Sequence, residues 1–388
     1  MPSPSKAGAC RMFVQGLRKE ITVKLSHDTW RQIGKAYNIP TEATVVPLSI
    51  AGNRTYQISL PGGIKQVLRL YDSGVQAAQV QSELSVLAYL GRRTELKTPS
   101  PIPVHNGQFF TTVDETNKPE PTLVAMFSFV SGKAIKDTIS LEMMFRVGQT
   151  LGLVDLALAK ADLEIKPTLS AIRPRWDSQA RIDWALSQMF KHQAEYKFLN
   201  DSISSKQLHP TLLTIAKRLQ NHFHKLWKHL PHQLLHGDAN LSNLVWDDTG
   251  IGIFDFTNMR YGPRIDELTA PLHSIYHLDI SNNVALSFSL LQLTEKLLEG
   301  YRRYIRVSEI ELSSFSLMQA IRLFGGLGWE VSRQQASQEK QALEQSGRAK
   351  IDQILALLEA YEHNLILRRF RKPKFWVALA AKVRGCQN

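Results

Sequence analysis

The sequence predicts an α+β fold made of two units of unequal size. Three short β-rich runs, VVPLSI, TYQISL and KQVLRLY, lie within residues 45–71 and are separated by the turn-forming groups AGN and PGG. From residue 140 onward the apolar residues follow helical spacing, apart from one hairpin-like stretch at 234–256. The length of 388 residues also favours more than one domain, because ordinary domains span about 100–200 residues. These observations predict a small antiparallel sheet with one helix, followed by a large and mainly helical unit.

The elements of the small unit can be placed in chain order. A short helix, HDTWRQIGKAY (28–38), precedes the first strand, and PGG at 61–63 is predicted to be a hairpin turn. The run at 73–91 predicts a helix, with Ser73 as its N-cap and Gly91 at its end. Two further strands, GQFFTTV and TLVAMFSFV, are predicted after it. The expected boundaries are an extension at 1–42, the small unit at 43–130, the large unit at 131–362 and a tail at 363–388.

Composition indicates a folded protein of a reducing compartment. An apolar content of 43% argues against global disorder. The two cysteines, Cys10 and Cys386, lie at opposite ends of the chain, which excludes a disulfide framework and a cysteine-based zinc site. The amino-terminal residues lack the apolar core of a signal peptide, and no apolar run approaches the ~20 residues that span a bilayer. We therefore expect a cytoplasmic protein.

The net charge of +12 is concentrated at the two ends of the chain. Residues 363–388 hold seven Lys and Arg residues and no acid, residues 1–26 hold five against one acid, and the remainder is nearly neutral. We therefore expect no specific nucleic-acid partner. The tail RRFRKPKFWVALAAKVRG (368–385) has two interpretations, which stay open. It either contacts an anionic membrane surface through its cations and aromatic residues, or packs as a helix on the large unit.

The stretch LLHGDANLSNLVWDDTGIGIFDF (234–256) predicts a β-hairpin with a polar open end. Its two strands flank DDTG, a group of turn-forming residues. Pairing Trp246 with Ile251 across this turn places Asn243 opposite Phe254. Asn243 therefore lies beside Asp255 at the end of the hairpin.

Three oxygen-bearing side chains are expected to converge at that end. Asp238 lies on a loop five residues before Asn243, so that it joins Asn243 and Asp255. Such oxygen donors suit Mg²⁺, which binds few protein oxygens together with water and substrate phosphates. Asp247 and Asp248 are instead predicted to be turn residues, because Asp commonly bonds its own backbone in turns.

The segment HGDANLSN resembles the H-G-D-x-x-x-x-N signature of the aminoglycoside phosphotransferase, choline kinase and homoserine kinase-like family. The resemblance implies a bilobal protein-kinase-like fold. It implies that Asp238 is the catalytic base or orients the alcohol, and that Asn243 and Asp255 bind Mg²⁺ on the phosphates of ATP. It further implies that His236 braces the loop, and that Asp266, in YGPRIDEL, supports it.

The small unit offers an ion pair that agrees with this resemblance. Arg69 lies in the middle of the strand QVLRLY, which is a costly place for a charge unless it is paired. Glu83 lies on the following helix, at the edge of its apolar stripe. An Arg on the third strand and a Glu on the next helix resemble the strand-Lys and helix-Glu pair of kinases.

Other nucleotide contacts are expected by position. SIAGNRTYQIS (49–59) takes the place of the loop that covers the phosphates, so that Ser49 and Asn53 are expected to face them. The link between the units, around Phe127 to Phe129, is where adenine bonds to backbone in kinase-like proteins.

The chain departs from the family pattern at two positions. Asp155 stands in FRVGQTLGLVDLALA (145–159) where the family often has His, so the role of that His does not transfer. Thr257 replaces the Gly of the D-F-G motif.

Further along, GGLGWEVSRQ (325–334) is expected to break a helix and to line the acceptor pocket.

The resulting expectation is an ATP- and Mg²⁺-dependent phosphotransferase that acts on a hydroxyl group of a small molecule. The acceptor classes are amino sugars, amino alcohols and amino acids, and the near-neutral body disfavours a strongly cationic acceptor. Two alternatives remain open, a protein Ser/Thr kinase on the same scaffold and a nucleotide-binding pseudokinase.

Overall fold

The computed structural model describes most of the chain between residues 25 and 363. The described ranges are 25–49, 53–93, 96–116, 118–135, 139–165, 172, 178–199, 210–282, 289–332 and 337–363. The leader and the basic tail 368–385 lie outside them, so both interpretations of the tail stay predictions. The chain forms two compact units, Met1–Ala77 with Pro101–Phe129, and Ala78–Ser100 with Val130–Asn388. Within the described ranges, no helix has the length and apolar character needed to cross a membrane.

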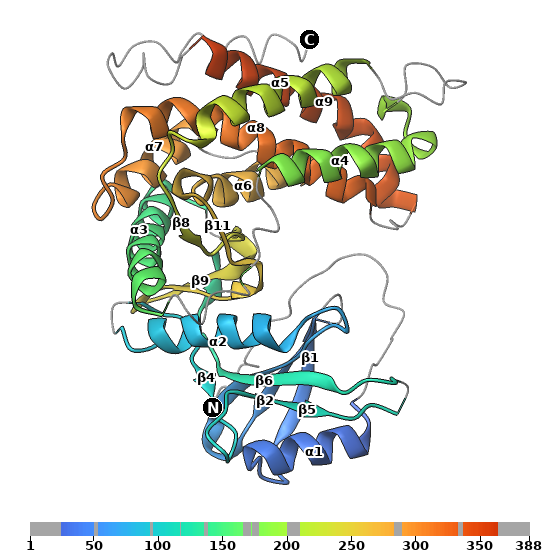
Figure 1. Cartoon of the computed structure of the whole chain (residues 1–388), viewed down its shortest axis with the longest axis vertical. Coiled ribbons are helices and arrows are strands. Elements are labelled where there is room, and N and C mark those ends of the chain that lie inside the picture. Colours follow the sequence, from blue (N-terminus) through green and yellow to red (C-terminus); the bar gives the residue numbers. More distant parts are fainter. Residues whose placement is uncertain are drawn as a thin grey trace, which may run out of the picture. The chain divides into compact units, whose positions relative to one another are not determined.

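The first unit is built on an antiparallel sheet in the order β1-β2-β3-β6-β4, with β5 also paired to β6 (Figure 1). The strands are β1 (Thr44–Ser49), β2 (Arg54–Ser59), β3 (Lys65–Leu70), β4 (Pro101–Ile102), β5 (Phe110–Val113) and β6 (Thr122–Ser128). All five strands predicted from the sequence are present. The predicted hairpin turn at 61–63 is confirmed, because β2 and β3 pair across it. Gly62 and Gly63 take φ angles of 79° and 81°, which side chains disfavour.

Helix α1 (His27–Tyr37) completes the core of the first unit, as predicted for 28–38. Ser26 caps the helix by accepting a hydrogen bond from the Thr29 N–H at 3.1 Å. Ile33 is fully buried in one cluster with apolar residues from four strands. These partners are Tyr56, Ile58, Leu68, Leu70, Val113, Val124 and Met126.

The second unit is mainly helical and carries two small sheets. Its helices are α2 (Ala77–Leu90), α3 (Leu141–Glu164), α4 (Ser178–His192), α5 (Pro210–Trp227), α6 (Thr269–Asn282), α7 (Leu290–Tyr301), α8 (Glu309–Ser332) and α9 (Ser337–Glu362). Its strands are β7 (Lys133–Ala134), β8 (His232–Leu235), β9 (Leu244–Asp247), β10 (Gly250–Ile253) and β11 (Arg260–Pro263). β10, β9 and β7 form one sheet, and β11 pairs with β8 in the other.

Two sequence predictions about helices are wrong. Helix α2 begins at Ala77 and not after Ser73, because the Val75 N–H bonds to the Asp72 carbonyl at 3.0 Å and closes a turn through Gly74. The expected break at 325–334 is absent up to Ser332, since α8 runs through the glycines. The glycines are explained by packing. A Cβ on Gly328 would lie 2.5 Å from the Cα of Ala185 in α4.

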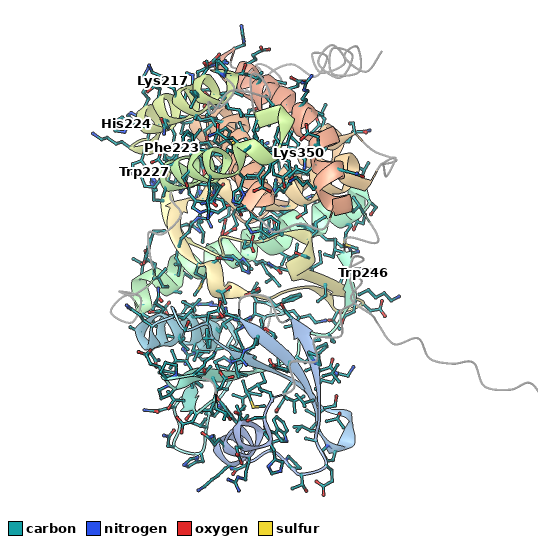
Figure 2. All side chains as sticks on the ribbon, turned by 90° about the vertical axis from the view of Figure 1, so that its right-hand side faces the viewer. Lys217, Phe223, His224, Trp227, Trp246 and Lys350 are labelled. Atoms are coloured by element: carbon teal, nitrogen blue, oxygen red, sulfur yellow. The ribbon has the colours of Figure 1, made fainter. Side chains whose placement is uncertain are left out.

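Helices α3 and α7 cross with their backbones in contact. A Cβ on Gly148 would lie 2.0 Å from the carbonyl oxygen of Leu297, and a Cβ on Gly300 would lie 1.9 Å from that of Phe145. Elsewhere in this unit, α8 and α9 share a buried ion pair, in which Lys350 (labelled in Figure 2) donates to Glu330 at 2.5 Å. These close contacts hold the helices of the second unit in fixed positions relative to each other.

Candidate active site

The hairpin of β9 and β10 has the register predicted from the sequence. Trp246 pairs with Ile251, and the Phe254 N–H donates to the Asn243 carbonyl at 3.1 Å. Only Asp248 and Thr249 form the turn, which is tighter than the four residues expected. The hairpin thus brings Asn243 next to Asp255.

Asp247 closes the other end of the hairpin. Its carboxylate accepts hydrogen bonds from the Lys97 ammonium and from the N–H and hydroxyl of Thr249, the latter two at 3.0 and 2.6 Å. These contacts, first that with Lys97, hold the pKa of Asp247 below its usual range. Asp248 lies in the turn, as predicted, whereas Asp247 is the last residue of β9 and bonds the turn residue Thr249.

His236 ties the loop after β8 to the hairpin. Its Nδ1 accepts from the Asp238 N–H at 3.2 Å, and its Nε2 faces the Phe254 carbonyl at 3.1 Å. Because the first contact needs a lone pair and the second a proton, the ring is neutral with its hydrogen on Nε2. The side chain is fully buried and lies edge-on to Phe256, with 4.4 Å between ring centroids.

The carboxylate of Asp238 is held by three side-chain amides. Asn240 donates to Oδ1, while Asn243 and Asn258 donate to Oδ2 at 3.4 Å each. Asn240 is itself contacted by the Ser274 hydroxyl of α6 at 3.4 Å. No role was predicted for Asn240 or Asn258 from the sequence, although both lie within three residues of the motif residues. The carboxylate is therefore fixed in orientation before any ligand binds.

Asn243 and Asp255 are arranged to offer oxygen atoms. The Asn243 Nδ2 donates to the Asp238 carbonyl at 2.8 Å, which turns Oδ1 of the amide to the other side. Asp255 has a left-handed backbone, with φ 66° and ψ 68°, a conformation that is rare for residues other than Gly. Its Oδ1 accepts from the Thr257 hydroxyl at 2.8 Å, so the residue that replaces the family Gly supports this carboxylate.

These donors fit Mg²⁺ by their chemistry. In the described ranges, no group of three or more His, Cys, Asp or Glu is placed to hold a metal ion. A carboxylate and an amide oxygen are nevertheless hard ligands, and Mg²⁺ commonly completes its shell with phosphate oxygens and water. Asn243 and Asp255 are therefore the residues that would hold it.

The peptide of Gly237 is held from both sides. The Glu267 carboxylate accepts from the Gly237 N–H at 3.1 and 3.2 Å, and Nη1 of Arg260 donates to the Gly237 carbonyl at 2.5 Å. Gly237 itself has a φ of 83°. Sequence reasoning assigned the supporting role to Asp266, and it missed the direct contact made by the adjacent Glu267.

Replacing Gly237 by Ala is expected to lower the free energy of unfolding by at least about 2 kcal/mol and to abolish turnover. The left-handed backbone costs a side chain about 1–2 kcal/mol. The new Cβ would also lie 2.2 Å from the Asn258 carbonyl oxygen. Chemical denaturation measures the loss. Gly34→Ala in α1 is the control, because a Cβ there meets no atom within 4 Å and is expected to stabilise the helix. Equal stability of Gly237→Ala and the unaltered protein would refute this account.

Asp266 lies at the centre of a buried arginine cluster, which consists of Arg181 (α4), Arg260 (β11) and Arg322 (α8). Its Oδ2 accepts from Arg260 at 2.5 Å and from Arg181 at 3.4 Å, and its Oδ1 accepts from Arg322 at 3.4 Å. Burial raises the pKa of Asp266, but the three guanidinium groups outweigh it and hold that pKa far below its usual range. Burial also lowers the pKa of Arg181, to about 10, which leaves it charged at neutral pH. Asp266 supports the loop indirectly, because Arg260 bonds both Asp266 and Gly237.

Asp155 is fully buried on α3, next to strand β8. It accepts a hydrogen bond from the Tyr301 hydroxyl at 2.5 Å, and its backbone carbonyl accepts from Gln233 of β8 at 2.9 Å. Burial, and next the charge of Glu267, raise the pKa of Asp155 well above its usual range. Asp155 therefore binds its proton more tightly in the folded protein than in the unfolded chain.

The raised pKa of Asp155 predicts the direction in which stability changes with pH. Because the folded state retains the proton, the stability contributed by Asp155 falls as pH rises above about 3.9, the ordinary Asp value. Asp155→Asn imitates the protonated acid, so we expect its midpoint of denaturation to fall less between about pH 5 and about pH 8 than that of the unaltered protein. A steeper fall in the variant would contradict the assignment.

The residues of the first unit that are expected to bind nucleotide lie on or next to strands β1, β2, β3 and β6. Arg69 is buried in β3, with its guanidinium 5.3 Å from the ring centroid of Phe127. Asn53 accepts from the Asp72 N–H at 3.1 Å, which ties together the ends of β2 and β3. Ser49 is exposed at the end of β1, and Phe129 follows the last residue of β6. Their contacts with a nucleotide stay predictions.

Glu83, the predicted partner of Arg69, belongs to the second unit. It is 5% exposed on α2, beside the buried apolar residues Val80, Leu84 and Leu87. Its pairing with Arg69 stays a prediction.

Comparison with solved structures finds the same fold in small-molecule kinases. The amicoumacin kinase hAmiN, in complex with AMP-PNP, Ca²⁺ and Ami, has a TM-score of 0.66 and 15% identity, over 87% of this chain and 96% of that one. A microcompartment-associated aminopropanol kinase has a TM-score of 0.61 and 16% identity, over 87% and 98%. Choline kinase from Cryptosporidium parvum Iowa II has a TM-score of 0.55 and 12% identity, over 87% and 97%. At such identities the likeness shows the fold.

The sequence comparisons place the chain in a family. No curated protein matches it in sequence. The model of the phosphotransferase enzyme family matches residues 44–289, which is more than half of the chain and includes β1, the hairpin and the arginine cluster residue Arg260. The protein-kinase-like α+β fold predicted from the sequence is confirmed by the structure and its relatives. The chain belongs to the phosphotransferase enzyme family.

Proposed function

We propose that this protein transfers the γ-phosphoryl group of ATP, with Mg²⁺, to a hydroxyl group of a small molecule. The observation that supports this most is the position of the Asp238 carboxylate. It is oriented by Asn240, Asn243 and Asn258, beside the hairpin end that joins Asn243 to Asp255. Family membership supports the reaction class, and the AMP-PNP and Ca²⁺ in the amicoumacin kinase complex support a nucleotide with a divalent cation.

Asp238 would accept or orient the hydroxyl proton of the acceptor. As the bond between the acceptor oxygen and the γ-phosphorus forms, the bond from that phosphorus to the leaving oxygen of ADP breaks, and the proton passes to the carboxylate. Asn243 and Asp255 would hold the Mg²⁺, whose charge offsets that of the phosphates. The amides around Asp238 keep its carboxylate in one orientation throughout.

For the first unit we propose that Arg69, positioned by Glu83, binds the α- and β-phosphates. Arg suits this role because its guanidinium can bind two phosphate oxygens at once. Ser49 and Asn53 would add polar contacts to the phosphates, and the backbone at Phe127 to Phe129 would bind the adenine.

Nucleotide binding is tested by the thermal shift that ATP or GTP produces with and without Mg²⁺. The expected result is an ATP shift that grows with Mg²⁺ and loses this Mg²⁺ dependence in Asp255→Ala. Asp248→Ala, in the turn of the same hairpin, is the matched control and is expected to behave like the unaltered protein. A Mg²⁺-dependent shift that survives in Asp255→Ala would count against the metal assignment.

Turnover is tested by ADP release in a screen of alcohols, amino sugars, amino alcohols and amino acids. The proposal expects release that depends on one small acceptor. Transfer to a protein in preference to every small alcohol would establish a protein kinase. Nucleotide binding without turnover on any acceptor would establish a pseudokinase.

A further inference from the structure

Among the residues that the structure describes, the arginine cluster joins three positive charges to one negative charge. Arg181, Arg260 and Arg322 share the single carboxylate of Asp266, and all four residues are buried. Two acids lie close to the cluster along the chain. Glu267 accepts from the Gly237 N–H, and Asp183 accepts from Gln220 at 2.6 Å. A buried ion is costly unless an opposite charge compensates it. Within the described ranges, the cluster therefore holds a positive surplus, and Arg260 links it to the loop that carries Asp238.

Two buried donors accompany this surplus. In the described part of the chain, Nη1 of Arg181 and Nε2 of Gln319 have no hydrogen-bond partner, and these residues are 8% and 4% exposed. Gln319 lies three residues before Arg322 on α8, so the two side chains emerge from adjacent turns on one side of the helix. Buried donors are almost always satisfied in native proteins. Unpartnered donors beside surplus positive charge form a site suited to an anion.

The cluster is linked directly to the proposed catalytic base. Arg260 donates through Nη2 to Asp266 and through Nη1 to the carbonyl of Gly237, the residue before Asp238. Arg181 reaches the same oxygen of Asp266 as Arg260 does. Arg181 and the loop that carries Asp238 are therefore joined through Asp266 and Arg260.

Arg181 and Arg322 are buried, but they are slightly more exposed than the other two residues of the cluster. Their side chains are 10% and 8% exposed, against 4% for both Arg260 and Asp266. Gly325, one turn after Arg322, makes room for this arrangement. A Cβ there would lie 2.6 Å from Cγ and Cδ of Arg181. The lack of a side chain at Gly325 lets two cations from different helices lie side by side, although their repulsion opposes it.

We propose that Arg181 and Arg322 bind an anionic group, a carboxylate or a phosphate, on the alcohol that this protein phosphorylates. This inference rests on the proposed function and narrows its acceptor. A guanidinium group binds the two oxygens of such an anion in a planar, bidentate way. The surplus positive charge repels a polycationic amino sugar and a simple amino alcohol. Among the acceptor classes considered above, the cluster favours a hydroxy acid, an amino acid or a phosphorylated alcohol.

The test uses a matched series of primary alcohols with about three to six carbons, whose far end is a carboxylate, a phosphate, a hydroxyl or an ammonium group. Calorimetric titration of the full-length protein measures their binding. The carboxylate or the phosphate members are expected to bind at least about tenfold more tightly than the neutral and ammonium members, as a charged hydrogen bond implies. The comparison of carboxylate with phosphate identifies which anion the site prefers. Equal binding across the series overturns the proposal.

Substitutions of the arginines test whether these residues cause the preference for anionic alcohols. Arg181→Gln is expected to weaken binding of the preferred anion about 10- to 100-fold while binding of the neutral member and of ATP stays the same. Arg322→Lys keeps the charge but loses the planar fork, so an intermediate loss is expected. Arg218→Gln is the matched control, because Arg218 bonds Glu362 on the partly exposed side of α5. Equal weakening of every ligand, ATP included, would make Arg181 a purely structural residue and overturn the proposal.

ADP release in the same series distinguishes a failure of the anion-site proposal from a failure of the proposed phosphotransferase function. Release with neutral or ammonium alcohols at the same kcat/KM as with the anionic ones removes the anion site and leaves the proposed function standing. A failure of ATP to bind removes the proposed function itself.

Discussion

Replacing Asp238 by Asn is expected to lower kcat by about 10²- to 10⁴-fold, the range that general acid–base groups contribute. The amide cannot take the hydroxyl proton. It also turns an NH₂ group toward Asn240, Asn243 and Asn258, which donate to the carboxylate of the unaltered protein. Because the role proposed for Asp238 concerns the acceptor, the affinity for ATP is expected to stay within a few-fold. Steady-state kinetics with the acceptor found in the screen measure both quantities.

Asp248→Asn is the matched control for this substitution. It makes the same chemical change at a turn position of the adjacent hairpin and is expected to keep full activity. If Asp238→Asn retained the kcat of the unaltered protein, Asp238 would have no catalytic role, and the reading of the loop would be wrong.

Replacing Asp266 by Ala is expected to destabilise the protein more than any other single change considered above. The carboxylate is the shared counter-ion of three buried arginines, and removing one partner of a buried ion pair commonly costs about 3–5 kcal/mol. It also releases Arg260, which holds the carbonyl of Gly237. Thermal and chemical denaturation measure the loss, and turnover is expected to fall with it.

The control for Asp266→Ala is Glu142→Ala, which removes an exposed pair with Arg146 on α3. Such a pair contributes about 0.3–0.5 kcal/mol. A similar stability of both variants at neutral pH would show that other groups neutralise the arginines.

The depressed pKa of Asp266 also predicts how stability depends on pH in acid. Because that pKa is depressed in the folded protein, the stabilising contribution of Asp266 is complete above about pH 3.9 and is lost as pH falls below that value.

The hairpin could be predicted closely because its physics is local. Strand-forming residues on both sides of a turn fix which residues face each other, so the pairing of Trp246 with Ile251 followed from the sequence. The same register predicted that Asn243 and Asp255 lie next to each other. The strand β11 was missed because RYGP contains Gly and Pro, which are poor strand residues, and it is held by pairing with the distant β8.

The arginine cluster could not be predicted, because its members come from three distant segments of the chain. Arg181, Arg260 and Arg322 belong to α4, β11 and α8, and nothing local in the sequence shows that they meet. Adjacent acids posed a similar problem. Asp266 and Glu267 lie next to each other, but one binds the arginines and the other the Gly237 N–H. Only the direction of each side chain separates these roles.

The glycines of α8 show how a local rule gave the wrong structure. Gly residues disfavour helices, which predicted a break at 325–334. Tertiary packing outweighs that preference, because Gly325 and Gly328 lie against Arg181 and Ala185 of α4. The same cause explains the glycines at the crossing of α3 and α7.

The central claim is that Asp238, Asn243 and Asp255 form a metal-dependent phosphotransfer site. The measurement that tests it most directly is acceptor-stimulated ADP formation from ATP, titrated with Mg²⁺, for the unaltered protein and for Asp255→Ala. We expect ADP and phosphorylated acceptor to form in equal amounts, to require Mg²⁺, and to fall to background in the variant while its fold is retained. Full, Mg²⁺-dependent turnover by Asp255→Ala would contradict the claim.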